Sequence, residues 1–540
     1  MTFAWNYGDI LDAVDEITPA DRPALIHGDR VVDWGTFTTH SNNLARALLD
    51  NGAEPGEKIA FYMRNRPEYA EAIAAGFKAR LTHTNVNYRY IDHELIYLLD
   101  NSDATIVIYA AEFASQVATI RLQLPNVHQW IEVADGYPGG SDVLDYDALV
   151  NHGDGTPLGL SRSPDDMLFL YTGGTTGMPK GVMWRQQDLW CVMGAGGNPR
   201  INLQPSVDLD DYLERLQAGD PPVNLPLPPI MHGTGLLSTI TAMTHGGTAV
   251  MLTGRGYDAN EALAAIDRHR VTAATIVGDA FARPMADALD EHPGKYDISS
   301  LRLISSSGVM WTRDVKARLL SHNPNLMLID GFSSSEAIGL GSSVMTKDQE
   351  IEVAKFTLGP KCKVFTEDLQ EVEAGSGASG MVAVTGFLPV GYYKDEEKTA
   401  RTFPVINGVR YSIPGDWVRV EHDGTLTLLG RGSNCINTAG EKVYPEEVEE
   451  ALKHHESVAD ALVIGLPDER WGQAITAVVK LNSGFELDEI GLREFARGHL
   501  AGYKLPKRIL AKDDLERAVN GKADYDKIRA YAQMELGVTK

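Results

Sequence analysis

Short apolar runs alternate with amphipathic stretches along most of the chain. Apolar runs typical of buried strands lie at 58–63, 104–109, 248–252, 273–277 and 301–305. The following stretches have the apolar spacing of helices, at 67–79, 112–122, 260–269, 280–289 and 314–320. Strands that alternate with helices predict stacked, mostly parallel sheets covered by helices, which is the α/β class.

The pattern changes to short strands and turns from about Gly375. The runs 381–386, 417–421 and 425–429 predict strands, and the Asp423-Gly424 pair between the last two predicts a hairpin turn. We expect a small β-barrel-like subdomain here. Residues 194–229 are rich in Gly, Pro and Asp and predict an irregular surface insertion.

The last hundred or so residues form a separate α+β pattern. Helical spacing at 444–454 and 487–499 surrounds strand-like runs at 458–466 and 474–481. We therefore predict a large N-terminal domain over residues 1–430 and a smaller C-terminal domain over 431–540, with the boundary near 430–433.

Charge and composition exclude several classes of protein. The 540 residues are 43% hydrophobic and 23% charged, which is typical of a globular chain with more than one domain. Lys and Arg number 49 against 74 Asp and Glu, a net charge of −25 that would repel a nucleic acid backbone. A small polyanion such as a nucleotide remains compatible, because a few backbone amides and one lysine can outweigh a diffuse negative field locally.

The cysteines and the N-terminus favour a cytoplasmic protein. Cys191, Cys362 and Cys435 are too few and too far apart for a disulfide framework or a CxxC-type zinc site. The N-terminal residues lack a signal-peptide pattern, and no uninterrupted apolar stretch approaches the length of a membrane span.

A glycine- and threonine-rich segment carries the clearest chemical signal. The strand-like run 167–171 leads into Thr172-Gly173-Gly174-Thr175-Thr176-Gly177-Met178-Pro179-Lys180-Gly181. Glycines let backbone N–H groups converge on an anion, while threonine hydroxyls and a lysine add donors and charge. A flexible turn would not need this combination, so we interpret the segment as a polyphosphate cradle. The one GxGxxG match, at 375–380, precedes a strand and is interpreted as an exposed turn.

The segment 328–336 ends in small residues, one aromatic residue and one acid. Phe332 could stack on an adenine ring, and the Glu336 carboxylate could hold Mg²⁺ close to phosphates. A capped helix start at Ser335 and Glu336 is the alternative for this stretch alone.

Together these motifs resemble the adenylate-forming superfamily of acyl-CoA synthetases, adenylation domains and firefly-type luciferases. Further motifs follow in the family's order from about Ser41 to Arg529. The resemblance implies an ATP site made of the residues 172–177 and 180, Ser307, Gly308, Asp330, Gly331, Phe332, Ser335, Asp416 and Arg431, and it places Gly440 in the coenzyme A site. It implies Mg²⁺ on Glu336 and Thr176, with Glu336 also counted among the catalytic residues.

The individual roles are also implied by the resemblance. Phe332 lies against adenine, Ser335 contacts the α-phosphate, and Asp416 accepts hydrogen bonds from the ribose. Arg431 contacts the nucleotide, and Ser433 takes the hinge position, where Asp or Lys is more usual. The loop containing Gly440 lines the pantetheine tunnel.

Two catalytic residues are carried over in the same way. Lys522 bridges the carboxylate and the α-phosphate during adenylation, and His232 gates the acyl pocket. Without the resemblance, an exposed lysine or a structural histidine would be the simpler interpretation of each. Lys504, Lys507 and Arg508 either meet the phosphates of coenzyme A or form a charged face.

The resemblance predicts an ATP-dependent acyl-CoA synthetase that forms acyl-AMP, releases pyrophosphate and transfers the acyl group to coenzyme A. A mobile C-terminal domain would serve both half-reactions. The sequence does not define the oligomeric state, and the resemblance offers a homodimer as one option because dimers are common in the family. A stand-alone enzyme that loads a carrier protein is the alternative, but no carrier-type serine motif follows. An inactive binding protein would lack a charged motif residue, and none is missing. The residues that make up these motifs favour, as substrate, a fatty acid or a bulky acid of the steroid side-chain or polycyclic type.

Overall fold

The computed structural model describes residues 4–174, 177–197, 203–308, 311–348, 355–431, 434, 436–438, 441–468, 472–500, 502–517 and 523–538. Thr175, Thr176, Ser433, Gly440 and Lys522 lie outside these residues, and the roles proposed for them remain predictions. For Arg431 only the backbone is described.

An eight-stranded sheet forms one half of the large N-terminal part. Its order is β19-β9-β8-β4-β3-β5-β6-β7, and all neighbours from β8 to β7 are parallel. The strands are β3 (Lys58–Tyr62), β4 (Thr82–Asn85), β5 (Ala104–Ala110), β6 (Gln129–Val133), β7 (Leu144–Asp145), β8 (Met167–Gly174), β9 (Gly177–Arg185) and β19 (Gly391–Tyr392).

A second sheet joins a mostly parallel half, in which only β2 is antiparallel to its neighbour, to an antiparallel half. Its path is β2-β1-β11-β10-β12-β13-β14-β15-β16-β23-β22-β18-β21-β20, with β17 beside β18. The first half contains β1 (Pro23–His27), β2 (Arg30–Asp33), β10 (Val223–Pro226), β11 (Thr248–Met251), β12 (Ala273–Ile276), β13 (Leu303–Ser307) and β14 (Met327–Ser334). The antiparallel half contains β15 (Ala337–Met345), β16 (Lys355–Leu358), β17 (Cys362–Phe365), β18 (Ser379–Thr385), β20 (Val405–Ile406), β21 (Val409–Ser412), β22 (Asp416–Val420) and β23 (Thr425–Arg431).

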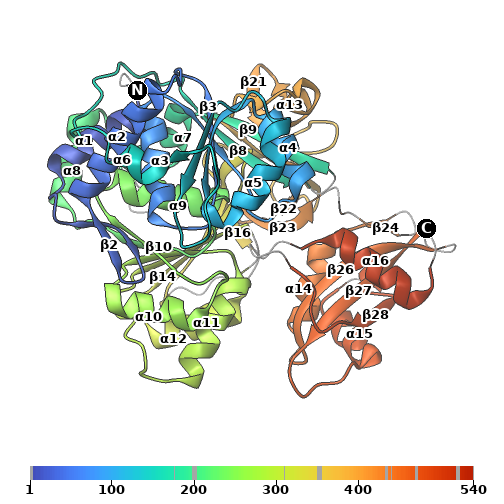
Figure 1. The fold of residues 1–540 in the computed structure, drawn as a ribbon. Helices are drawn as coiled ribbons and strands as arrows, with labels where there is room; N and C mark the ends of the chain where they lie inside the picture. The colour runs from blue at the N-terminus through green and yellow to red at the C-terminus, as the bar shows by residue number, and fades with distance from the viewer. Residues whose placement is uncertain are drawn as a thin grey trace.

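Helices fill the space between the two sheets and cover their outer faces (Figure 1). A shared core packs helices between Leu25 and Ala249 of the larger sheet and Ile59 and Ile106 of the smaller one. The helices of this layer are α1 (Tyr7–Ile17), α2 (Trp34–Asp50), α3 (Pro67–Lys78) and α9 (Gly233–Thr244). The outer layers are α10 (Ala259–His269), α11 (Asp279–Glu291) and α12 (Arg313–His322) on the larger sheet, and α4 (Asp92–Asn101) and α5 (Ala114–Ile120) on the smaller.

The remaining helices of this part are short or peripheral: α6 (Tyr146–Val150), α7 (Gln186–Val192), α8 (Leu209–Ala218) and α13 (Glu396–Thr402). No helix in the described ranges is long and apolar enough to cross a membrane.

The smaller C-terminal domain has its own five-stranded sheet and core (Figure 1). Its strands are β24 (Ile436–Thr438), β25 (Glu441–Val443), β26 (Val458–Asp468), β27 (Gly472–Leu481) and β28 (Arg508–Ala511). Its helices are α14 (Pro445–Lys453), α15 (Glu489–Arg497) and α16 (Tyr525–Leu536). The predicted α/β fold with a separate α+β domain is confirmed.

Two details of the prediction change. The segment 194–229 is not wholly an irregular insertion, because it contains α8 and the central strand β10, which pairs with β11 and β12. Prolines at 221, 222 and 226 bound this four-residue strand and conceal it in the sequence. The antiparallel strands after Gly375 extend an open sheet, and no closed barrel occurs among the residues that the structure describes.

Candidate active site

Most of the predicted site residues lie at or near the carboxyl ends of strands in the two sheets. Gly173 lies near the end of β8, and Ser307 ends β13. Asp330, Gly331 and Phe332 lie in the middle of β14. Ligands of open α/β sheets bind outside the carboxyl ends of strands, because connecting loops and unpaired backbone groups meet there. The topology therefore brings together segments that are far apart in sequence.

The predicted phosphate cradle is the tip of the β8–β9 hairpin. Thr172 lies opposite Lys180, and Gly174 lies opposite Gly177 with a register shift between these two pairs. Trp184 at the buried end of β9 donates from Nε1 to the carbonyl oxygen of Ser335 at 2.9 Å. This hydrogen bond joins the hairpin to the loop that leads to Glu336, so two predicted ATP-binding segments are neighbours.

A buried asparagine that the sequence did not single out holds three segments together. The Nδ2 of Asn85 donates to the carbonyl oxygens of Tyr171 at 2.9 Å and Met231 at 2.7 Å. Its Oδ1 accepts from the backbone N–H of Tyr171 at 2.7 Å. Asn85 thus fixes the hairpin and the loop before His232 to β4. The sequence signal for Asn85 was the wholly polar run Thr-His-Thr-Asn of β4. The structure shows this strand to be completely buried, so its polar groups need hydrogen-bond partners.

His232 lies at the start of α9, where its backbone adopts an extended conformation. Gly235 in the first turn of this helix has no room for a side chain, since a Cβ atom would lie 2.4 Å from the carbonyl oxygen of Pro229. Asn65, after β3, also binds this loop, accepting from the Ile230 N–H at 2.7 Å. The His232 loop is therefore tied to the smaller sheet at two points.

Glu336 lies in the turn between β14 and β15 and contacts the smaller sheet. Its Oε1 accepts a hydrogen bond from the hydroxyl of Tyr392 at 2.7 Å, and its backbone carbonyl accepts from Ser412 at 2.6 Å. Tyr392 belongs to β19, which pairs with β9 of the hairpin. The predicted Mg²⁺ ligand and the predicted phosphate cradle are thus linked through one tyrosine, which the sequence reasoning also missed.

Lys180 forms an ion pair that was not expected. Its ammonium lies 3.0 Å from Oδ2 of Asp395, and this carboxylate raises the pKa of Lys180. Asp395 caps α13 by accepting from the N–H of Lys398. The positive charge that Lys180 was predicted to add at the cradle is therefore partly offset by the Asp395 carboxylate.

Asp330 is buried and paired with Lys316 of α12 at 3.2 Å. Burial raises the pKa of Asp330 to about 6, although the lysine opposes this shift. The side chain of Lys316 also lies over the ring of Trp311. This arrangement favours a structural role for Asp330 in holding the end of β14.

The remaining predicted contacts lie on neighbouring strands. Gly331 pairs with Ser307, and the following Gly308 adopts a φ of +94°, which favours glycine. Phe332 packs against Phe356, with ring centroids 5.6 Å apart, and is 9% exposed. Its ring thus forms part of the core of the antiparallel half.

Asp416 begins β22 and lies opposite Arg431, the last residue of β23. The next residue, Trp417, packs against Tyr444 just before α14, with ring centroids 6.0 Å apart. Asp416, the predicted ribose-binding acid, therefore lies beside the segment that joins the larger sheet to the C-terminal domain. In the C-terminal domain, Lys504 forms an ion pair with Glu447 at 2.5 Å.

Both described flanks of the segment that contains Lys522 are anchored to β26 and α14. Arg517 donates to both carboxylate oxygens of Asp460, at 2.5 and 2.9 Å. The hydroxyl of Tyr525 donates to Oε1 of the buried Glu449 at 3.0 Å, and the same oxygen accepts from the Val463 N–H.

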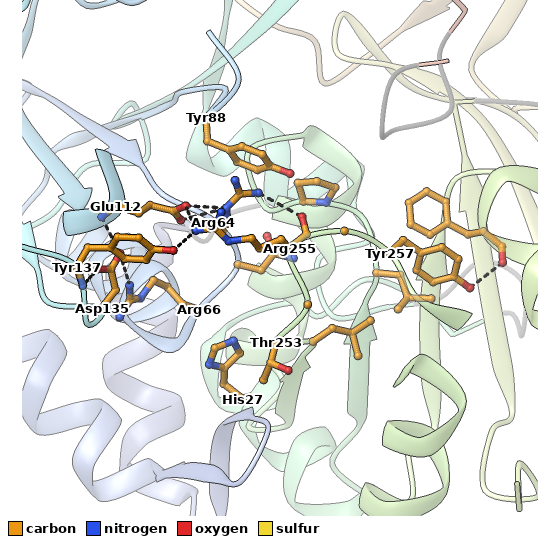
Figure 2. Close-up of a pocket in the computed structure, with 17 residues that line it drawn as sticks. His27, Arg64, Arg66, Tyr88, Glu112, Asp135, Tyr137, Thr253, Arg255 and Tyr257 are labelled. Carbon is orange, nitrogen blue, oxygen red and sulfur yellow. Dashed lines mark hydrogen bonds and ion pairs between the residues drawn. The ribbon is translucent and has the colours of Figure 1, made fainter. Parts of the chain in front are cut away.

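A cavity of about 310 Å³ opens where the carboxyl ends of the two sheets meet (Figure 2). Figure 2 shows Glu112 between Arg64 and Arg255, and the distances from its carboxylate to them are 3.0 and 3.3 Å. The Arg64 guanidinium lies over the ring of Tyr88. The lining also includes Arg66, Asp135, Tyr137 and Pro229, which belongs to the His232 loop. Three arginines and several aromatic rings suit a ligand with both phosphates and a planar ring.

The described residues contain no group of three or more His, Cys, Asp or Glu side chains that could hold a metal ion by themselves. A protein-only metal cage is therefore absent from this part of the chain. A single carboxylate such as Glu336 is nevertheless sufficient where substrate phosphates supply most ligands of Mg²⁺.

Comparison with known proteins agrees with this geometry. The family model described as AMP-binding enzyme matches residues 11–393, and the AMP-binding enzyme C-terminal domain matches 447–522. A 3-oxocholest-4-en-26-oate–CoA ligase from Rhodococcus rhodochrous is 40% identical over 537 residues, covering 97% of this chain and 95% of that protein. A medium/long-chain-fatty-acid–CoA/3-oxocholest-4-en-26-oate–CoA ligase from Mycobacterium tuberculosis is also 40% identical, covering 97% and 96%.

The solved structures include an anthranilate CoA ligase, AuaEII, in complex with anthranoyl-AMP. It superposes with a TM-score of 0.85 at 21% identity and covers 100% of this chain and 99% of that one. This likeness concerns the fold. Together with the family models and the full-length relatives, it leads to one conclusion: the chain belongs to the family of AMP-binding enzymes.

Proposed function

We propose that this protein is an ATP-dependent acyl-CoA synthetase for a medium or long fatty acid or a steroid side-chain acid. The observation that carries the proposal is 40% identity to CoA ligases of such acids over nearly the whole of both chains. A similarity of this extent covers the large N-terminal part and the C-terminal domain alike. An enzyme that loads a carrier protein is not favoured by these relatives.

The chemistry requires that a carboxylate becomes an electrophile. Its oxygen attacks the α-phosphorus of ATP, the bond from this phosphorus to the β-bridging oxygen breaks, and pyrophosphate leaves with the electron pair. The coenzyme A thiol then attacks the acyl carbon of acyl-AMP, loses its proton, and AMP leaves. The protein mainly has to align the reactants and stabilise charge.

We assign the phosphates of ATP to the β8–β9 hairpin. Thr172, the glycines and the backbone N–H groups near the tip supply donors, while Asp416 holds the ribose and Phe332 borders the adenine. The hydrogen bonds from Trp184 to Ser335 and from Tyr392 to Glu336 support this assignment, because they keep the two phosphate-facing segments adjacent.

Mg²⁺ fits the residues present. The Tyr392 hydroxyl donates to Oε1 of Glu336 and orients the carboxylate, and no hydrogen bond to Oε2 occurs among the described residues. Glu336 would hold the ion together with the phosphates and Thr176. When bound, Mg²⁺ would neutralise phosphate charge during adenylation.

We assign the phosphate-bearing end of coenzyme A to the arginine-lined cavity of Figure 2. The cavity borders Pro229 in the loop that carries His232, the residue predicted beside the reacting carboxylate. Its mixed polar lining suits a nucleotide better than an acyl chain. Lys504 is paired with Glu447, and in the cavity Arg64 and Arg255 are paired with Glu112, so a phosphate would compete with a carboxylate at either place.

The test measures the two half-reactions separately. Pyrophosphate release is measured with acetate, fatty acids of increasing length and a steroid side-chain acid, and thioester formation is measured from supplied acyl-AMP. We expect activity with the long or bulky acids, and a Lys522→Ala variant should lose acyl-AMP formation far more than thioester formation. Preference for short linear acids would refute the substrate proposal, and equal losses in both half-reactions would refute the role of Lys522.

A further inference from the structure

Two lysines and two carboxylates lie beside the β8–β9 hairpin. Lys180 is on β9, Asp395 caps α13, Lys398 is in the first turn of α13, and Glu336 is in the β14–β15 turn. Tyr392 of β19 lies among them and pairs with Val182 of the hairpin. Only Lys180 and Glu336 were predicted as site residues, so Lys398 has no assigned role.

The groups of this cluster other than Lys398 already have partners. Lys180 is paired with Asp395 at 3.0 Å, and Glu336 accepts from Tyr392 at 2.7 Å. Among the described residues, no carboxylate forms an ion pair with the ammonium of Lys398. This ammonium lies over the ring of Tyr392, 4.1 Å from the ring centroid.

The surroundings of Lys398 favour the binding of an anion by its ammonium group. Its side chain is partly buried, and the loss of solvation lowers the pKa of Lys398. Glu336 and Asp395 attract the ammonium, while Lys180 and Arg401 repel it. A cation that has lost solvent without gaining a counter-ion gains more from an arriving anion than a fully solvated one does.

The simpler alternative is that Lys398 only packs its alkyl chain on Tyr392. Lys394, four residues earlier, shows what such a lysine looks like in this region. It lies 5.4 Å from the ring centroid of Tyr393 and forms an ion pair with Asp103 at 2.7 Å. Lys398 has the closer ring contact, no such carboxylate partner, and a position next to the predicted Mg²⁺ ligand.

We propose that Lys398 binds the β- and γ-phosphates of ATP and the pyrophosphate that leaves from them. The proposal rests on the assignment of the ATP phosphates to the β8–β9 hairpin. When the bond between the α-phosphorus and the bridging oxygen breaks, that oxygen keeps the electron pair and pyrophosphate gains negative charge. The ammonium of Lys398 offsets this charge by direct contact and neither gives up nor accepts a proton.

The decisive variant is Lys398→Met, which keeps an unbranched apolar side chain that can pack on Tyr392 but removes the charged end. Lys394→Met is the matched control, and Lys398→Arg restores a charge. The assays are exchange of labelled pyrophosphate into ATP in the presence of the acid, calorimetric binding of magnesium pyrophosphate, and thioester formation from supplied acyl-AMP. Melting temperatures of all three variants establish that each is folded.

We expect Lys398→Met to raise the KM for pyrophosphate and weaken its binding by about 10- to 100-fold, the range for a lost charged contact. Lys398→Arg should recover most of this loss, and Lys394→Met should stay within about twofold of the wild type. Thioester formation from acyl-AMP should also change by less than about twofold, because pyrophosphate takes no part in it.

Equal pyrophosphate affinity in Lys398→Met and Lys394→Met would overturn the proposal, as would equal losses in Lys398→Met and Lys398→Arg. A wild-type protein that exchanges no pyrophosphate with any acid tested would overturn the proposed function as well. The two failures are distinguishable, because in the first case the wild type remains active.

Discussion

Replacing the buried Asn85 by leucine tests whether one side chain couples the hairpin to the His232 loop. The substitution keeps the approximate volume but removes three hydrogen bonds, one accepted from the Tyr171 N–H and two donated to backbone carbonyls. Each buried backbone group left without a partner costs about 1 kcal/mol or more, so the expected loss of stability is about 3 kcal/mol. Asn51→Ala is the control, since this more exposed asparagine donates only to Ala47 within its own turn.

Urea unfolding measures the loss of stability, and amide hydrogen exchange reports on the site directly. The N–H of Tyr171 should lose protection in Asn85→Leu, and acyl-AMP formation should slow because both the cradle and the His232 loop lose an anchor. Asn51→Ala should change stability by less than about 1 kcal/mol and leave the Tyr171 amide unaffected. A protected Tyr171 amide together with wild-type stability in Asn85→Leu would refute the reasoning.

Three further predictions follow from separate parts of the structure. Gly235→Ala should destabilise the protein strongly in thermal unfolding, because its Cβ would lie 2.4 Å from a carbonyl oxygen, whereas Gly233→Ala meets only Leu170 at 3.8 Å and should be tolerated; equal melting temperatures would contradict this. Burial lowers the pKa of His83 to about 4, below its unfolded value of about 6.5, so the unfolded state binds more protons between these values and stability should fall by about 3 kcal/mol as pH drops from 6.5 to 4. Urea unfolding at several pH values should show that the free energy of unfolding of His83→Phe changes less with pH than that of the wild type. An equal change with pH in both proteins would disprove this contribution. Arg255→Ala should raise the KM for coenzyme A about tenfold without changing that for ATP, while Arg268→Ala, in an exposed ion pair with Asp29, should change neither; equal effects on both substrates would argue against the assigned cavity.

The local elements of this protein could be predicted from the sequence, because each depends on periodicity within a short window. The strand at 58–63 and the helix at 67–79 were predicted within one residue of β3 and α3. The hairpin at Asp423-Gly424 and the turn before β18 also follow from local turn chemistry. The β10 strand was missed because prolines at its ends outweigh a four-residue apolar signal.

The chemical motifs were recognisable for the same reason. Glycine, threonine and lysine in one short segment indicate a phosphate cradle wherever the segment lies in the fold, and the order of the motifs identified the family. The fold class and the family are confirmed, while the roles of all the individual site residues remain predictions.

Only the tertiary structure decided which residues contact one another within and between the two sheets. Tyr392 meets Glu336 although 56 residues separate them, and Asn85 meets Tyr171 across 86 residues. Such contacts depend on strand order and on the layer of helices that sets the distance between the sheets, and neither leaves a periodic trace in the sequence. The same packing pairs Lys180 with Asp395 and places Lys398 over the ring of Tyr392. Nothing in the sequence singled out Lys398, and these contacts are the basis for proposing it as the pyrophosphate-binding residue.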